Sequence, residues 1–210
     1  GVIDNIPFSP LVTQTYTVSG TDANNCSNTS SINIVVNALP NVTALASSPS
    51  VCFDSPVTLN GAGALTYTWT GGVINNIPFS ALITQTYMVT GTDANNCSNT
   101  SMITVVVNNL PVISATASSL AVCENDSVTL NGVGAAFYTW SGGVNNNTAF
   151  VPGVSTTYTV TGTDANNCSN TSSISITVYP LPMPVIVQSG STLTCSNTSN
   201  CTYSWELDGT

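Results

Sequence analysis

The sequence predicts an all-β fold: a series of two-sheet β-sandwiches joined head to tail in a rod, with essentially no helix. Three observations predict it. The chain repeats itself every 71 residues, short segments alternate apolar with polar side chains, and turn-forming residues separate these segments every eight to twelve positions. The abundance of Val, Ile, Thr and Tyr is typical of strands. No segment shows the 3.6-residue periodicity of a helix.

The repeat defines the expected domains. The string Gly-Thr-Asp-Ala-Asn-Asn-Cys-Ser-Asn-Thr-Ser begins at Gly20, Gly91 and Gly162, and residues 1–36 match residues 72–107 at 28 of 36 positions. Leu-Pro pairs recur with the same period and mark the boundaries. We expect the C-terminal part of a repeat at 1–38, full repeats at 39–109 and 110–180, and the N-terminal part of a divergent domain at 181–210.

The two partial domains predict that these residues are a window on a longer chain, or that a neighbouring chain supplies the missing strands. The connectors 37–40 and 108–111 contain proline and lack the Gly/Ser composition of a flexible linker. We therefore expect consecutive domains to keep a fixed geometry.

Each element of a full repeat follows from local pattern. In repeat 39–109, alternation predicts strands that include 57–59, 67–69, 87–89 and 103–107. Turn residues separate them at 60–63, 71–72 and 93–96. About seven short strands in one repeat are typical of an immunoglobulin-like sandwich.

The charge excludes several functions. The 210 residues contain no Lys, Arg or His and nine acidic residues, a formal net charge of −9. Nucleic acid and anionic membrane surfaces are excluded as partners because their recognition needs cationic side chains. The chain lacks a conventional general base near neutral pH and a Schiff-base lysine, so we expect neither an enzyme nor a cofactor. No apolar run approaches the roughly 18 residues of a membrane span, so direct membrane insertion is not expected.

The repeat resembles a known family. The segments 122–130, 138–140 and 157–166 are similar to the tandem immunoglobulin-like (PKD-like) repeats of giant Bacteroidota cell-surface adhesins exported by the type IX secretion system. The resemblance implies extracellular display at the cell surface and an adhesive, filamentous or stalk role. The tail from Pro184 departs from the repeat and resembles the different immunoglobulin-like module that often precedes the C-terminal sorting domain of such proteins.

Seven cysteines in an exported repeat protein favour disulfides. We expect Cys52 in the loop before the second strand and Cys97 in the last hairpin, roughly 25 Å apart, whereas a disulfide needs Cα atoms within about 7 Å. A head-to-tail array would instead bring Cys52 to Cys168 and make an interdomain staple. The alternative is pairing within domains. The candidates are Cys26, Cys52, Cys97, Cys123, Cys168, Cys195 and Cys201, of which the last two could close locally across a hairpin.

The Asp-Ala-Asn-Asn turn has two interpretations. Asp93 and Asn95 are spaced like the first two ligands of an EF-hand, but the Gly and Glu that complete such a loop are missing. A structural role is favoured, in which Asp93 caps the turn and Asn96 takes the left-handed conformation. No metal site is predicted.

The remaining candidates for a binding or modification site are the aromatic residues and one serine. Trp69 and Trp140, with nearby tyrosines, would form either a carbohydrate platform or the core of the sandwich, and the fold favours the core. Asp126-Ser127-Val128 resembles the Asp-Ser/Thr-apolar O-glycosylation site of the Bacteroidota. Ser127 is therefore a candidate for modification, with an unmodified turn serine as the alternative.

Together these features predict a non-enzymatic structural and adhesive extracellular protein, a rod, stalk or filament at the cell surface. Its expected partners are copies of itself in a longer chain or filament, and surface glycans. With about three acidic groups per repeat, repulsion between neighbouring rods is weak and screened beyond about 8 Å. The alternative is a carbohydrate-binding or spacer region of a secreted enzyme.

Overall fold

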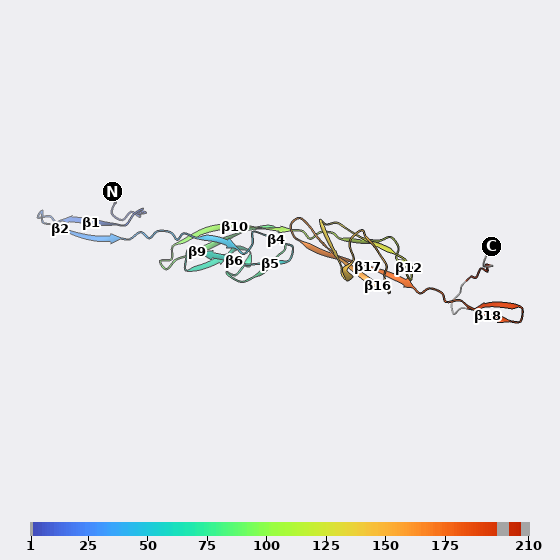
Figure 1. The fold of residues 1–210 in the computed structure, drawn as a ribbon. Helices are drawn as coiled ribbons and strands as arrows, with labels where there is room; N and C mark the ends of the chain where they lie inside the picture. Colours follow the sequence, from blue (N-terminus) through green and yellow to red (C-terminus); the bar gives the residue numbers. More distant parts are fainter. Residues whose placement is uncertain (1, 197–201, 207–210) are drawn as a thin grey trace. The chain divides into compact units, whose positions relative to one another are not determined.

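The computed structural model describes residues 2–196 and 202–206, and strands make up most of it (Figure 1). Within these residues the helical segments are two three-residue 3-10 turns, η1 (Thr70–Gly72) and η2 (Ser141–Gly143). The predicted all-β class is therefore confirmed. By contact the chain divides into two units, 1–108 and 109–210, and each contains one sandwich and one separate hairpin.

The sandwich of the first unit has a four-stranded sheet in the order β4-β10-β9-β7. In this sheet β10 pairs parallel with β4 and antiparallel with β9. The opposing layer consists of two strand pairs, β3 with β6 and β5 with β8. The strands are β3 (Thr43–Ala46), β4 (Ser50–Cys52), β5 (Ser55–Val57), β6 (Leu59–Ala62), β7 (Thr66–Trp69), β8 (Phe79–Ala81), β9 (Gln85–Thr92) and β10 (Ser98–Asn108).

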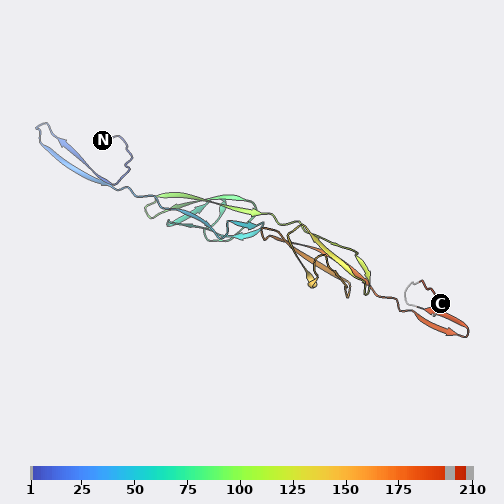
Figure 2. The ribbon, with the colours of Figure 1, turned by 45° about the horizontal axis from the view of Figure 1, so that its top comes forward.

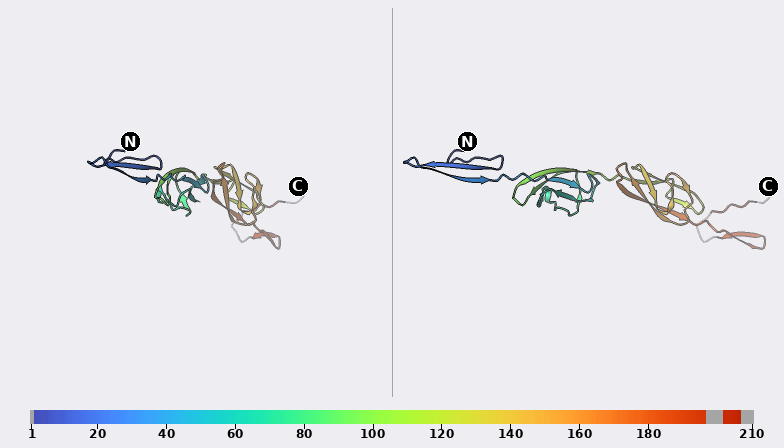
Figure 3. Two further views of the ribbon diagram at one scale, coloured as in Figure 1. Left: turned by 90° about the vertical axis from the view of Figure 1, so that its left-hand side faces the viewer. Right: turned by 60° about the vertical axis from the view of Figure 1, so that its left-hand side comes forward.

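The second unit repeats this arrangement, and Figures 2 and 3 show its strands from other sides. One sheet has the order β12-β17-β16-β14 and the other β11-β13-β15. The single strand β13 takes the place of β5 and β6, which are separate in the first unit. The strands are β11 (Ser114–Ala117), β12 (Ala121–Cys123), β13 (Val128–Val133), β14 (Phe137–Trp140), β15 (Ala149–Phe150), β16 (Thr156–Thr163) and β17 (Ser169–Tyr179).

Two hairpins lie outside the sandwiches. In the first unit β1 (Gln14–Thr21) pairs antiparallel with β2 (Ser27–Ile34). In the second unit β18 (Val185–Ser189) pairs antiparallel with β19 (Thr192–Ser196). Residues 14–34 correspond to residues 85–105 of the next repeat, so β1 and β2 are the counterparts of β9 and β10.

Alternation along the strands builds each core. In β9 the inward positions are buried and the intervening ones are more exposed, as expected for strands with one covered face. The buried residues of the first sandwich are Val42, Val57, Leu59, Trp69, Ala81, Tyr87, Val89 and Val105. Those of the second are Val128, Leu130, Trp140, Tyr158, Val160 and Ile176.

A tight turn after β6 depends on glycine. Gly63 has φ +89°, and a Cβ atom there would lie 1.9 Å from the carbonyl oxygen of Asn41. Gly134 has φ +103° and the same 1.9 Å conflict with Val112. Only glycine combines this backbone conformation with such a close approach. The turn predicted at 60–63 was placed too early, because residues 60–62 belong to β6 and the turn begins at Gly63, where a side chain would clash.

Replacing Leu59 by alanine tests the core of the first sandwich. Leu59 is fully buried, so Leu59→Ala should cost about 2–5 kcal/mol of unfolding free energy. Hydrogen exchange should accelerate at the amide of Val89 and stay unchanged at Val160 in the other sandwich. The control is Leu65→Ala at a side chain that is 69% exposed, with an expected effect within about 0.5 kcal/mol. Equal effects of the two variants would contradict the assignment of the core.

Candidate functional site

The two cysteines of each repeat lie at opposite ends of one long strand. Cys52 ends β4 and is the register partner of Asn108 at the end of β10, while Cys97 directly precedes Ser98 at its start. Eleven residues of strand separate these ends by about 35 Å. The predicted distance between Cys52 and Cys97, roughly 25 Å, was therefore too small, although both values are far beyond the reach of a disulfide. Cys52 lies at the end of a strand and not in the predicted loop.

The second sandwich repeats this placement. Cys123 is the register partner of Tyr179 at the end of β17, and Cys168 directly precedes Ser169 at its start. A disulfide within either sandwich is excluded because its Cα atoms would have to lie within about 7 Å.

The oxidation states agree with this geometry. Cys52 and Cys168 are each disulfide-bonded, whereas Cys26, Cys97 and Cys123 are free thiols. The alternative of pairing Cys52 with Cys97 and Cys123 with Cys168 is therefore wrong.

Of the predicted pair Cys195 and Cys201, the structure describes only the first cysteine. Cys195 is also a free thiol, and its predicted partner Cys201 lies outside the residues that the structure describes.

The Asp-Ala-Asn-Asn turn is organised by its own carboxylate. Oδ1 of Asp93 accepts hydrogen bonds from the backbone N–H groups of Asn95 (2.8 Å) and Cys97 (2.9 Å). Asn96 has φ +62°, the left-handed conformation that was predicted for it. The copies at Asp22 and Asp164 make the same two bonds. Among the described residues no group of three or more His, Cys, Asp or Glu side chains lies together.

Two of the three tryptophans belong to the cores. Trp69 and Trp140 are buried, and each indole N–H donates to an asparagine side-chain oxygen at 3.0 Å, that of Asn75 or Asn146. The same oxygen of Asn75 accepts the backbone N–H of Gly61 at 2.7 Å, so one side chain ties two strands together. Because the indole faces are covered, these residues do not form a carbohydrate platform.

Ser127 lies in an exposed turn directly before the buried Val128. Asp126 closes this turn through its backbone N–H, which donates to the carbonyl of Cys123 at 3.0 Å. Ser127 is accessible to a modifying enzyme, and its O-glycosylation stays a prediction. The first full repeat has Pro56 at the corresponding position.

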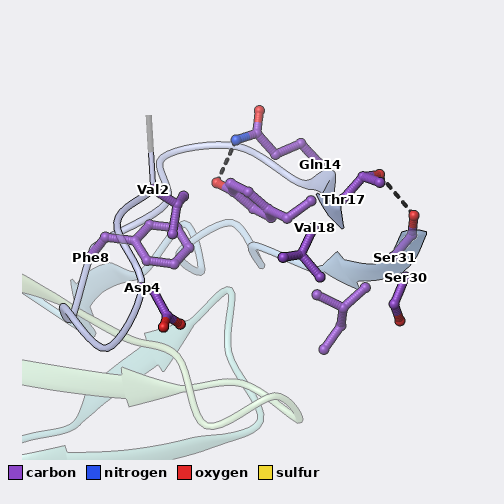
Figure 4. A pocket seen from close by; sticks show the side chains of 10 residues that line it. Val2, Asp4, Phe8, Gln14, Thr17, Val18, Ser30 and Ser31 are labelled. Carbon is purple, nitrogen blue, oxygen red and sulfur yellow. Dashed lines mark hydrogen bonds between the residues drawn. The ribbon is translucent and has the colours of Figure 1, made fainter. Parts of the chain in front are cut away.

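A groove that sequence analysis did not predict lies beside the β1–β2 hairpin. Its volume is about 800 Å³. Figure 4 shows Val2 and Phe8 on one side and Val18 on the other, with Asp4 at the rim. The lining residues are Val2, Asp4, Phe8, Gln14, Tyr16, Thr17, Val18, Ser30, Ser31 and Ile32.

This hairpin has the local geometry of its counterparts in the full repeats. The ring centroids of Phe8 and Tyr16 lie 5.1 Å apart, edge to face, compared with 5.5 Å for Phe79–Tyr87 and 5.2 Å for Phe150–Tyr158. The register is also the same, with Thr21 opposite Ser27 as Thr92 is opposite Ser98. The sequence held no signal for the groove: the 71-residue shift aligns Val18 with Val89, yet Val18 is exposed and Val89 is buried.

No family model and no curated protein matches this sequence. Among solved structures the chain is similar to murine CEACAM1b, with 16% identity, TM-score 0.31, and coverage of 66% of this chain and 100% of that one. It is similar to the Ca2+-stabilised adhesin with which an Antarctic bacterium binds ice, with 14% identity, TM-score 0.41, and coverage of 83% and 59%. A third is SGBP-B of the Bacteroides ovatus mixed-linkage glucan utilisation locus, in complex with a heptasaccharide, with 16% identity, TM-score 0.23, and coverage of 86% and 56%.

Adhesion-type extracellular domains are thus among the structures that this chain resembles. At these identities and TM-scores the resemblances do not assign a function. They also do not test the likeness to PKD-like repeats or export by the type IX system. None of the helical segments in the described part of the chain has the length and apolarity to cross a membrane.

Acid should weaken the turn of the β1–β2 hairpin. Hydrogen bonds from the backbone N–H groups of Cys26 and Asn24 lower the pKa of Asp22 below its ordinary value. The ionised carboxylate of Asp22 therefore stabilises the turn fully above the ordinary aspartate pKa, and this stabilisation is lost as the pH falls through the lowered pKa of Asp22. An NMR titration should show the Cys26 amide shift following the lowered pKa. Asp22→Asn keeps an acceptor and should abolish this transition; a midpoint at the ordinary pKa would contradict the assignment.

Proposed function

We propose that this chain is a non-enzymatic structural and adhesive protein of the cell surface, whose sandwiches serve as segments of a rod, stalk or filament. The observation that carries the proposal is the placement of cysteines at the two ends of the long strand in each repeat. This placement cannot reinforce a single sandwich and suits a link between successive ones. The buried tryptophans support a scaffold rather than the alternative, a carbohydrate-binding region.

The proposed link is an interdomain staple between Cys52 and Cys168. Both cysteines are oxidised, and Cys26 and Cys97 of the first unit are free thiols. Neither Cys52 nor Cys168 can reach the other cysteine of its own sandwich. A bond between them satisfies both observations.

Such a staple would change how the chain carries force. A pull along the chain would pass through the disulfide and bypass residues 53–167, which include most strands of both sandwiches. The sandwiches would therefore resist extension even when their hydrogen bonds break. An oxidising compartment is needed to keep the bond, which supports the proposed extracellular location.

The outer faces of the paired strands β9–β10 and β16–β17 are suited to association with copies of the chain. Hydroxyl pairs bridge β9 and β10 through Thr86 and Thr104 at 2.7 Å, and β16 and β17 through Thr157 and Ser175 at 2.7 Å. On β16 and β17 this face is rich in hydroxyl groups, and on β9 and β10 it also carries the exposed side chains of Met88 and Met102. The sequence has no cationic side chain. We infer that copies of this chain, and surface glycans, are the partners of this face.

Thiol counting tests the staple. Cys52→Ser should free the thiol of Cys168 and raise the count in the denatured, unreduced protein by one. The control Cys97→Ser should lower it by one. Mass spectrometry of peptic fragments should recover a peptide pair containing Cys52 and Cys168, whereas a Cys52–Cys97 pair would disprove the staple.

Single-molecule stretching tests the mechanical role. With the disulfide intact, unfolding should not release residues 53–167. Reduction, or Cys52→Ser, should add about 400 Å of contour length, because 115 residues at about 3.6 Å each enter the path of the force. Equal extension of the oxidised and reduced chains would contradict the proposed role.

A further inference from the structure

The dipeptide Asn-Gly occurs once in each complete repeat, as Asn60-Gly61 in β6 and as Asn131-Gly132 in β13. Asparagine deamidates most readily before glycine, because glycine has no side chain to hinder the reaction. The glycine nitrogen attacks the side-chain carbonyl carbon of the asparagine, a C–N bond forms, and ammonia leaves. Water then opens the cyclic imide to aspartate or isoaspartate, so the site gains one negative charge.

The fold of each repeat requires the glycine of this dipeptide. A Cβ atom at Gly61 would lie 2.5 Å from Cδ1 of Tyr67, and a Cβ atom at Gly132 would lie 2.9 Å from Cδ1 of Tyr138. The ring of Tyr67 is held in place, because its hydroxyl donates to the carbonyl oxygen of Ala64 at 2.6 Å. A larger residue therefore cannot replace either glycine to slow the reaction.

The attacking nitrogen is held by a side chain in both repeats. The N–H of Gly61 donates to Oδ1 of Asn75, and the N–H of Gly132 donates to Oδ1 of Asn146, each at 2.7 Å. In the described part of the chain β6 pairs only with β3, where Gly61 lies opposite Ala44. A side-chain oxygen thus takes the place of a backbone carbonyl on the other edge of β6, and both glycines are buried.

The accepting oxygen is itself fixed by a second bond. Oδ1 of Asn75 also accepts the indole N–H of Trp69 at 3.0 Å, and Oδ1 of Asn146 accepts that of Trp140 at 3.0 Å. An amide oxygen is too weak a base to remove the hydrogen from the glycine nitrogen. The bond therefore holds this hydrogen without promoting the attack, and it must break before the nitrogen can react.

We propose that Asn60 and Asn131 are deamidation sites that are protected in the folded sandwich by Asn75 and Asn146, which hold the glycine N–H. Opening of a sandwich frees the nitrogen and starts the reaction. The product places a lasting negative charge next to Leu59, which is 0% exposed, or at the corresponding position of the other sandwich. Isoaspartate also lengthens the backbone of the strand, so an opened sandwich would not regain its original pairing.

This inference goes beyond the proposed function and is independent of it. The bonds that carry it lie within single sandwiches, so the staple and the partners of the outer faces do not enter. Failure of the test below would leave the thiol count and the stretching experiment unaffected.

Mass spectrometry of peptic fragments tests the protecting residues after incubation of the full chain at mildly alkaline pH. Asn75→Leu removes the acceptor of the buried Gly61 N–H and should raise the deamidation rate of Asn60 at least about tenfold. Asn131 in the same molecule is the internal control and should keep its rate. Asn146→Leu should have the reverse effect. In concentrated urea both sites of the wild type should react fast, and a slow reaction there would contradict the assignment.

Trp69→Phe separates protection from stability. This variant removes the other donor to Oδ1 of Asn75 and weakens the sandwich, but it keeps the bond to Gly61. When urea is used to match the two variants in unfolding free energy, Asn60 should react more slowly in Trp69→Phe than in Asn75→Leu. Equal rates would overturn the proposal, because unfolding alone would then explain them, and so would a wild-type rate in Asn75→Leu.

The wild type provides the test if Asn75→Leu does not fold. In a urea series below the unfolding transition, the deamidation rate of Asn60 should follow the exchange rate of the Gly61 amide hydrogen, since both need this N–H to be released. A deamidation rate that does not change with this exchange rate would overturn the proposal.

Discussion

Each sandwich depends on the coverage of one apolar sheet face by a second layer. The sheet that contains β9 and β10 buries Tyr87, Val89 and Val105 only because β3 and β6 lie against it. Side-chain ion pairs cannot contribute, since the sequence has no Lys, Arg or His. Burial of apolar surface and hydrogen bonds of neutral groups must therefore carry the stability. The β1–β2 hairpin shows the same face without its cover.

Most of the sandwich could be predicted from the sequence because alternation and turns are local properties. The strand around 87–89, the turn at Asp93 and the left-handed Asn96 follow from residue type alone. The short strand that ends at Cys52 was missed, because its pairing with β10 depends on residues more than fifty positions away. Sequence distance hides such pairings from any local pattern.

The groove of Figure 4 was not predictable for a different reason. Residues 14–34 and 85–105 have almost the same pattern. The face that carries Val18 is nevertheless exposed, whereas the corresponding face, which carries Val89, is buried. A pattern reports which side chains share a face and not what lies against it. Asn75 is a related case. Nothing in the sequence indicates that its side-chain oxygen accepts hydrogen bonds from both Trp69 and Gly61.

The separation of Cys52 and Cys168 along the chain has a consequence for damage. The proposed staple spans 116 residues, which exceeds the 71-residue period. In an array of such repeats, successive disulfide loops would overlap, so that residues 123–168 would lie inside two of them. A protease that cuts the backbone once within a sandwich would then leave both fragments covalently joined. Separating the fragments would then require a second cut within the same loops or the loss of the disulfides that span the first cut, so the proposed rod would tolerate a single nick.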